Sequence, residues 1–226
     1  MKTVLITGAN RGIGLSLVKQ YLKTGWHVHA TYRSELEAAD LLSISGKSLT
    51  CHQLDVTDYP AMDCLAKTLP PLDVLINNAG YYGPKGKSFG TTDVEQWRKV
   101  LEVNTIAPLK LVEALYTKLQ QGSIKKIACL SSKVGSITEN TSGGGYIYRS
   151  SKAALNSVVK SLSNDLSPQG FTVLALHPGW VLTDMGGPNA LIEAQVSATG
   201  LIQVIDGAKD HQSGAFLNYD GTSLPW

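Results

Sequence analysis

Short runs of β-branched and apolar residues alternate along the chain with longer segments in which apolar residues recur every three or four positions. The first pattern is typical of buried strands and the second of amphipathic helices. Their alternation predicts β-α-β units that form a parallel sheet. We expect seven strands, over residues 4–7, 28–32, 49–54, 74–76, 127–130, 173–176 and 215–218. Right-handed crossovers would wind them into a mostly parallel sheet with helices on both faces.

Two of the helical segments carry clear apolar stripes that we expect to lie on the sheet. The stripes are Ile13, Leu17 and Tyr21 in the first segment, and Leu155, Val158, Val159, Leu162 and Leu166 in the second. A further helix is predicted over residues 191–205. Because we see no internal repeat or linker, we expect one domain that spans residues 1–226.

Composition and charge exclude several classes of protein. The chain is 43% hydrophobic and 17% charged, which favours a folded protein with much buried surface. A net charge of +2, with Lys and Arg in pairs at most, argues against a nucleic acid or a membrane as partner. Cys51, Cys64 and Cys129 lack C-x-x-C spacing, so neither a disulfide framework nor a thiolate metal site is indicated. With neither a secretory signal nor a membrane-spanning run, we expect a cytoplasmic protein.

A glycine-rich turn lies where the first predicted strand gives way to the first predicted helix. At this junction a parallel sheet presents backbone amides to a diphosphate, although an ordinary turn is the alternative. Gly8 permits a tight turn, Gly12 lets the backbone approach the diphosphate, and Gly14 allows close packing of helix on strand. The position favours a dinucleotide site in a single-domain Rossmann fold. The residues expected to bind the cofactor are Gly8, Asn10, Arg11, Gly12, Ile13 and Gly14.

The end of the second strand indicates which dinucleotide is bound. NAD-specific folds place an acidic residue there, whereas an arginine accommodates the 2′-phosphate of NADP. The strand here ends in Arg33, and Arg11 adds a second positive charge in the glycine turn. A guanidinium pairs well with phosphate, so we expect NADPH rather than NADH. The alternative is that both arginines are solvated surface charges.

Two further groups of polar and small residues follow the third and fourth strands. They are Asp55 with Val56, and Asn78, Ala79 and Gly80. Because ligands bind at the carboxyl edge of an open parallel sheet, we expect both groups to contact the cofactor. Helix capping or turn formation is an equally good interpretation of either group taken alone.

Tyr148 and Lys152 are four residues apart at the start of an amphipathic segment, so their side chains share one helix face. A lysine charge beside a phenol can lower the phenol pKa. A shift from about 10 to neutrality needs roughly 4 kcal/mol of preferential stabilisation of the phenolate. The spacing by itself also occurs on solvated helices. Ser132, which follows the fifth strand, gives a third polar group at the same edge of the sheet.

With these motifs in order, the chain resembles the short-chain dehydrogenase/reductase family, and within it the small C-factor-like and sniffer-type carbonyl reductases. The motifs are the turn over residues 7–14, the Asn-Asn-Ala-Gly of residues 77–80, Asn104, Ser132, Tyr148 with Lys152, and Pro178-Gly179 followed by Thr183. The resemblance implies an NADP-dependent oxidoreductase that reduces a ketone, aldehyde or quinone carbonyl to an alcohol.

The resemblance also assigns roles to four residues. Tyr148 would protonate the carbonyl oxygen as general acid, and Ser132 would hold that oxygen by a hydrogen bond. Lys152 would lower the pKa of Tyr148 and bind the nicotinamide ribose. Asn104 would interrupt a helix and anchor a water that links Lys152 to solvent. Further cofactor contacts would come from Pro178, Gly179, Val181 and Thr183.

Several neighbouring residues leave alternatives open. Tyr146 and Ser131 lie beside the catalytic candidates, but only Tyr148 has a lysine four positions on, and Ser132 fits the family's S-x-x-G pattern. Tyr146 and Trp180 are therefore expected to line the substrate site, although packing is as good an interpretation of Trp180. His27 and His29 share one face of a strand, and without a third ligand we expect no metal site.

The main alternative to an enzyme is a dinucleotide-binding regulatory or signalling protein of the same fold. As partners we expect a small-molecule carbonyl substrate and a second copy of the chain, in a homodimer or homotetramer. The physiological substrate, the preferred reaction direction and the oligomeric state are not encoded in any motif that we recognise.

Overall fold

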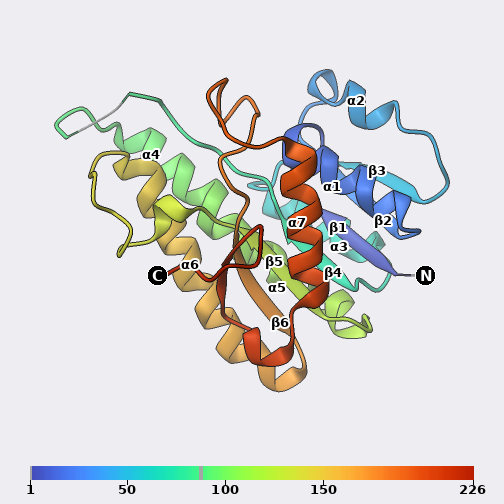
Figure 1. The fold of residues 1–226 in the computed structure, drawn as a ribbon. Coiled ribbons are helices and arrows are strands. Elements are labelled where there is room, and N and C mark those ends of the chain that lie inside the picture. The colour runs from blue at the N-terminus through green and yellow to red at the C-terminus, as the bar shows by residue number, and fades with distance from the viewer. Residues whose placement is uncertain (1, 87–88) are drawn as a thin grey trace.

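The computed structural model describes residues 2–86 and 89–226 and contains one seven-stranded sheet (Figure 1). The strand order is β3-β2-β1-β4-β5-β6-β7, and each neighbouring pair runs parallel. The strands are β1 (Thr3–Ile6), β2 (His27–Tyr32), β3 (Leu49–Gln53), β4 (Val74–Asn77), β5 (Lys126–Leu130), β6 (Thr172–His177) and β7 (Phe216–Asn218). The predicted doubly wound α/β class is confirmed, and the predicted strand bounds differ from these by one residue at most.

Helices connect the strands. They are α1 (Gly12–Lys23), α2 (Ala39–Leu42), α3 (Tyr59–Thr68), α4 (Val94–Leu101), α5 (Ala107–Gln121), α6 (Tyr146–Leu166) and α7 (Ala194–Gly207). Of the helices in the described part of the chain, none is both long enough and apolar enough to cross a membrane.

The predicted start of the helix over residues 191–205 is wrong, since α7 begins at Ala194. The backbone amides of Leu191 and Ile192 donate to the Trp180 carbonyl over 2.9 and 3.2 Å. This pairing holds the segment before α7 in an extended conformation. The chain after β6 is thereby tied to the segment that leads into α7.

Two hydrophobic layers enclose the sheet, because successive strand residues face opposite sides. In β1, Val4 and Ile6 pack with the stripes of α1 and α7, whereas Leu5 packs with α3, α5 and α6. Figure 1 shows α7 beside α1, and the Gln20 amide joins them by donating to the Gln195 carbonyl over 3.0 Å. The predicted apolar stripes therefore lie on the sheet, one on each face.

A π-helical turn over Glu102–Ile106 interrupts the long helix between α4 and α5. Single π-turns of this kind often occur at functional sites, because they redirect side chains within a helix. Asn104 lies in the middle of this turn, so the helix is interrupted at the residue where an interruption was expected. The turn packs against α6, which carries Tyr148 and Lys152.

Candidate active site

The glycine turn lies where the sheet order reverses, since β1 and β4 are neighbours and the chain leaves them on opposite sides. Gly8 has a φ of +60°, and a Cβ added there would lie 2.8 Å from the Ala79 Cα. A Cβ on Gly14 would lie 2.3 Å from the Gly8 carbonyl oxygen. Both positions therefore require glycine, and the turn presses directly on the loop after β4.

Asn78 and Thr7 hold the glycine turn against that loop. The Asn78 side-chain amide donates to the carbonyls of Thr7 and Gly8 over 2.7 and 2.9 Å. The Thr7 hydroxyl accepts from the backbone amides of Asn78 and Ala79, each over 3.0 Å. Val56 and Ala79 line a small hollow next to Thr7. The side chain of Asn78 thus shapes the turn, and its expected contact with the cofactor stays a prediction.

The N-terminus of α1 offers backbone amides to an anion. Arg11 precedes the helix in extended backbone, and Ile13 packs partly into the core. A Cβ on Gly12, whose φ is +54°, would lie 3.0 Å from the Thr183 methyl, so the loop after β6 crosses the turn here. Asn10 donates to the Glu37 carbonyl over 3.0 Å. These residues surround the N-terminus of α1 and form a cradle whose partial positive charge suits an anion.

Charged groups flank this cradle. Arg33 is exposed at the end of β2, and Arg11 forms an exposed ion pair of 3.3 Å with Asp184. Burial alone would raise the pKa of Asp55, but hydrogen bonds from Thr57 and the charge of Arg33 hold it below its usual value. The Asp55 carboxylate accepts from the Thr57 amide and hydroxyl over 2.9 and 2.7 Å. These bonds fit the interpretation of Asp55 as a turn residue, and its contact with the cofactor stays a prediction.

The four residues expected after β6 shape the loop that crosses the cradle. Gly179 has a φ of +85°, and a Cβ there would lie 2.5 Å from Ile192 Cδ1. Pro178 accepts a hydrogen bond of 2.6 Å from the Ser197 hydroxyl, and the buried Val181 pairs with Ile192. These contacts fix the path that brings Thr183 over the glycine turn.

Tyr148 and Lys152 lie on the same face of the first two turns of α6, as their spacing predicts. The Lys152 ammonium is 5.7 Å from the centroid of the Tyr148 ring and donates to the Leu130 carbonyl over 2.7 Å. Burial lowers the pKa of Lys152 to about 8. Burial and the neighbouring Tyr82 raise the pKa of Tyr148, the direction opposite to the one expected from a nearby lysine.

The structure distinguishes Ser132 from Ser131. Ser131 is buried, and its hydroxyl donates to Asn156 over 2.5 Å, so it belongs to the packing between β5 and α6. Ser132 is half-buried, and its hydroxyl accepts a long hydrogen bond of 3.4 Å from a backbone amide two residues on. A Cβ on Gly135 would lie 2.8 Å from the Lys152 Cβ, so the turn after Ser132 packs directly on α6.

Asn104 joins the π-turn to the loop after β4. Its side chain is fully buried, accepts from the Tyr81 amide and donates to the Tyr81 carbonyl, both over 2.8 Å. It also donates to the Ser151 hydroxyl over 3.0 Å. A Cβ on Gly80 would lie 3.5 Å from the Asn104 Oδ1 and 3.9 Å from the Lys152 ammonium. The loop after β4, the π-turn and α6 therefore meet beside Lys152.

Two residues that sequence reasoning missed contact Tyr148. The Tyr82 ring stacks on the Tyr148 ring with centroids 4.6 Å apart and an interplanar angle of 28°. The Met185 sulfur lies 4.0 Å from the Tyr148 hydroxyl. The position of Tyr82 only two residues after Gly80 was a signal that could have placed it at the site.

Tyr146 and Trp180, the predicted substrate residues, are both exposed. Tyr146 opens α6, two residues before Tyr148. The Trp180 indole donates to the Gly186 carbonyl over 2.8 Å, which fixes the ring on the segment that also carries Met185. Both side chains are thus free to meet a ligand.

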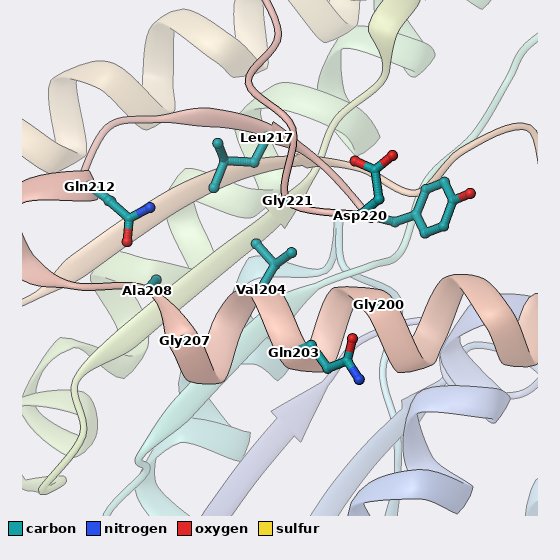
Figure 2. Close-up of a pocket in the computed structure, with 10 residues that line it drawn as sticks. Gly200, Gln203, Val204, Gly207, Ala208, Gln212, Leu217, Asp220 and Gly221 are labelled. Carbon is teal, nitrogen blue, oxygen red and sulfur yellow. The ribbon is translucent and has the colours of Figure 1, made fainter.

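A cavity of about 260 Å³ lies away from these residues, between α7 and the turn after β7 (Figure 2). It is lined by Gly200, Gln203, Val204, Gly207, Ala208, Gln212, Leu217, Tyr219, Asp220 and Gly221. None of the predicted catalytic residues lines it, since Ser132 follows β5 and both Tyr148 and Lys152 lie on α6. The cavity is therefore separate from the candidate active site.

Three histidines gather on β2 and β3. The His29 Nδ1 lies 2.9 Å from the His52 Nε2, and the rings of His27 and His29 are 4.9 Å apart. Within residues 2–86 and 89–226, no group of three or more His, Cys, Asp or Glu side chains is arranged to hold a metal ion.

Known proteins are similar to this chain in both sequence and structure. Residues 2–191 match the short chain dehydrogenase family. C-signal of Myxococcus xanthus is 46% identical over 156 residues, which cover 69% of this chain and 93% of that protein. Among solved structures, the carbonyl reductase Sniffer of D. melanogaster is 36% identical with a TM-score of 0.93, and each chain is covered completely. The NADPH-bound carbonyl reductase from chicken fatty liver is 33% identical with a TM-score of 0.93, over 100% of this chain and 94% of that one.

Proposed function

The chain belongs to the short-chain dehydrogenase family, and from this premise we propose that it is an NADPH-dependent carbonyl reductase. One observation carries the proposal. Tyr148 and Lys152 share a face of α6, the turn after Ser132 packs on Lys152, and all three lie at the strand edge that holds the glycine turn. This is the donor set that proton transfer to a carbonyl oxygen requires.

The protein's own groups would handle the proton and orient the substrate. The Ser132 hydroxyl would donate a hydrogen bond to the carbonyl oxygen, and Tyr148 would donate its proton to that oxygen. Lys152 would stabilise the phenolate that remains, because its charge lies over the Tyr148 ring. Asn104, next to Lys152, would support proton resupply from solvent.

The dinucleotide would lie across the glycine turn with its diphosphate at the N-terminus of α1. When bound, NADPH supplies the hydride that reduces the carbonyl carbon. Arg33 would bind the 2′-phosphate, and Arg11, which is paired with Asp184, would add a second positive charge. The NADPH bound to the chicken carbonyl reductase supports this choice of coenzyme.

The second candidate is a regulatory or signalling protein that binds the dinucleotide without turnover. The similarity to a protein named C-signal supports this second candidate. A regulatory protein of this kind does not need a phenol, an ammonium and a hydroxyl at one edge of the sheet. The proposal of an enzyme therefore accounts for more of the site.

Isotope transfer from the coenzyme tests the proposed reaction. The protein is incubated with NADPH deuterated at nicotinamide C4 and with quinones, isatin-like diketones, aldehydes or pterins. We expect an alcohol or hydroquinone product, with deuterium on the former carbonyl carbon of each aldehyde or ketone that turns over. Failure of every class to oxidise the dinucleotide, with the dinucleotide demonstrably bound, would favour the regulatory alternative.

A further inference from the structure

Tyr82 contacts the proposed proton donor, but it neither gives nor takes a proton in the proposed reaction. Its ring stacks on Tyr148 with centroids 4.6 Å apart and planes inclined by 28°. Offset stacking of this kind is attractive, and it fixes the relative position of two rings. Tyr82 is 36% exposed, so part of its surface faces outward beside the Tyr148 ring.

The backbone on both sides of Tyr82 is held in place. Both backbone polar groups of Tyr81 are hydrogen-bonded to the buried Asn104 side chain over 2.8 Å. Gly83 has a φ of +80°, and a Cβ there would lie 2.8 Å from the Val100 Cγ2 and 3.5 Å from the Ile147 Cγ2. Tyr82 therefore projects from a short loop that is packed between the π-turn, α4 and α6.

Met185 approaches the Tyr148 hydroxyl from the segment after β6. Its sulfur is 4.0 Å from that hydroxyl, and the residue is 40% exposed. A carbonyl oxygen that accepts a proton from Tyr148 must lie within hydrogen-bond distance of its hydroxyl. Groups attached to the carbonyl carbon then extend from a point next to the Tyr148 hydroxyl, and Tyr82 stacks on that ring while Met185 contacts the hydroxyl. An aromatic ring and a thioether favour contact with flat conjugated groups.

We propose that Tyr82 is a specificity-determining residue, which selects carbonyl substrates that carry a flat aromatic ring on the carbonyl carbon. This inference rests on the proposed reductase function and adds the substrate class. The substrate ring packs against the outward surface of Tyr82 while the carbonyl oxygen reaches the Tyr148 hydroxyl. Aliphatic carbonyls reach the same hydroxyl but lose this contact.

The test compares two α-diketones that differ in the aromatic ring. The preference is the kcat/KM for 1-phenyl-1,2-propanedione divided by that for 2,3-pentanedione, both with NADPH. Because both values come from one preparation, the fraction of active protein cancels. We expect Tyr82→Leu to lower this preference by at least ~5-fold, mainly through the KM of the phenyl substrate, and Tyr82→Phe to keep it within ~2-fold.

Tyr81→Leu is the matched control, because the Tyr81 hydroxyl points to Gln96 over 3.0 Å and not to Tyr148. It is expected to leave the preference within ~2-fold. An unchanged preference in Tyr82→Leu overturns the inference. So does an equal loss in Tyr82→Phe, which would assign the effect to the hydroxyl. Should Tyr82→Leu fail to fold, as judged by circular dichroism, Tyr82→Ile takes its place, because isoleucine has neither an aromatic ring nor a thioether.

If the proposed reductase function is wrong, the experiment gives a different result from the one expected if only the role of Tyr82 is wrong. In that case the wild type reduces neither diketone, and binding of 1-phenyl-1,2-propanedione, measured by calorimetry in the presence of NADP⁺, decides the question. At least ~5-fold weaker binding to Tyr82→Leu than to wild type supports the role of Tyr82. Equal binding to both overturns it.

Discussion

Tyr148 is protonated at pH 7, as an ordinary phenol already is, and burial and Tyr82 raise its pKa further. It therefore carries the proton that a general acid must donate, whereas the raised pKa makes that donation less favourable. The Lys152 ammonium, with a pKa lowered by burial to about 8, is still largely charged at pH 7. The spacing of the two residues predicted their shared face. It could not predict the bond from Lys152 to the Leu130 carbonyl, which depends on a rotamer and on the position of β5.

The arginine at the end of β2 is expected to read the 2′-phosphate. A charge-assisted hydrogen bond contributes about 1.5–3 kcal/mol, and each 1.4 kcal/mol changes a dissociation constant tenfold. We therefore expect Arg33→Ala to weaken NADPH binding by at least ~10-fold and NADH binding by less than ~2-fold. Calorimetric titration of both coenzymes measures the two losses.

Arg98→Ala is the control for this substitution, because Arg98 is an exposed arginine that pairs with Glu95 on α4. It should leave both dissociation constants unchanged. Equal losses for NADPH and NADH in Arg33→Ala would show that Arg33 does not bind the phosphate. Arg11, whose guanidinium is paired with Asp184, would then be the next candidate for binding the 2′-phosphate.

At the scale of elements, the first β-α junction depends on the absence of a side chain at Gly14. A methyl group there would lie 2.3 Å from the Gly8 carbonyl oxygen, so the helix or the turn has to move. We expect Gly14→Ala to lower the free energy of unfolding by at least about 2 kcal/mol and to abolish dinucleotide binding. Urea denaturation and dinucleotide titration measure these effects.

Gly207, the last residue of α7, provides the contrast. A Cβ built there meets no atom within 4 Å among the described residues. Gly207→Ala should leave stability unchanged or raise it by up to about 1 kcal/mol, because alanine loses less entropy than glycine in a helix. Comparable destabilisation by both substitutions would argue against close packing as the reason for glycine at position 14.

Sequence patterns predicted the elements well where they are buried. Alternating and β-branched runs located each strand to within a residue, because burial on both faces of a parallel sheet leaves a continuous apolar signal. The segment before α7 was predicted less well. Its extended form comes from hydrogen bonds to Trp180, and such long-range pairing leaves no local trace. For Tyr82 the closeness to Gly80 was a local signal, but its contact with Tyr148 joins residues 66 positions apart and leaves no sequence pattern.

At the scale of the whole molecule, the histidine group on β2 and β3 makes stability depend on pH. His29 is 6% exposed, and burial together with the neighbouring His52 and His27 lowers its pKa to about 4. Among the described residues, its Nε2 is a buried atom without a hydrogen-bond partner. The sequence places His27 and His29 on one face. The third ring, His52, lies beside them only because of the register in which β2 pairs with β3.

The sign of the effect follows from the depressed pKa. The folded state favours neutral His29, so stability is complete above the unfolded pKa of about 6.5 and is lost as pH falls toward 4. The loss from this group at pH 5 is about 2 kcal/mol. We expect His29→Gln to show a smaller drop in Tm between pH 7.5 and pH 5 than the wild type. Identical drops would mean that His29 is not the group that titrates. His177, whose pKa burial also lowers to about 4, would then be the next candidate.

The proposed reduction depends on proton donation by Tyr148, and removal of the Tyr148 hydroxyl tests that donation most directly. The measurement is kcat/KM for NADPH-dependent reduction of 1-phenyl-1,2-propanedione by Tyr148→Phe, with the NADPH dissociation constant determined in parallel. Tyr116→Phe, which removes a phenol oxygen bonded to Gln169 on the protein surface, is the control. We predict a loss of at least ~100-fold in kcat/KM with NADPH affinity within ~2-fold of wild type. A wild-type rate in Tyr148→Phe would contradict the account.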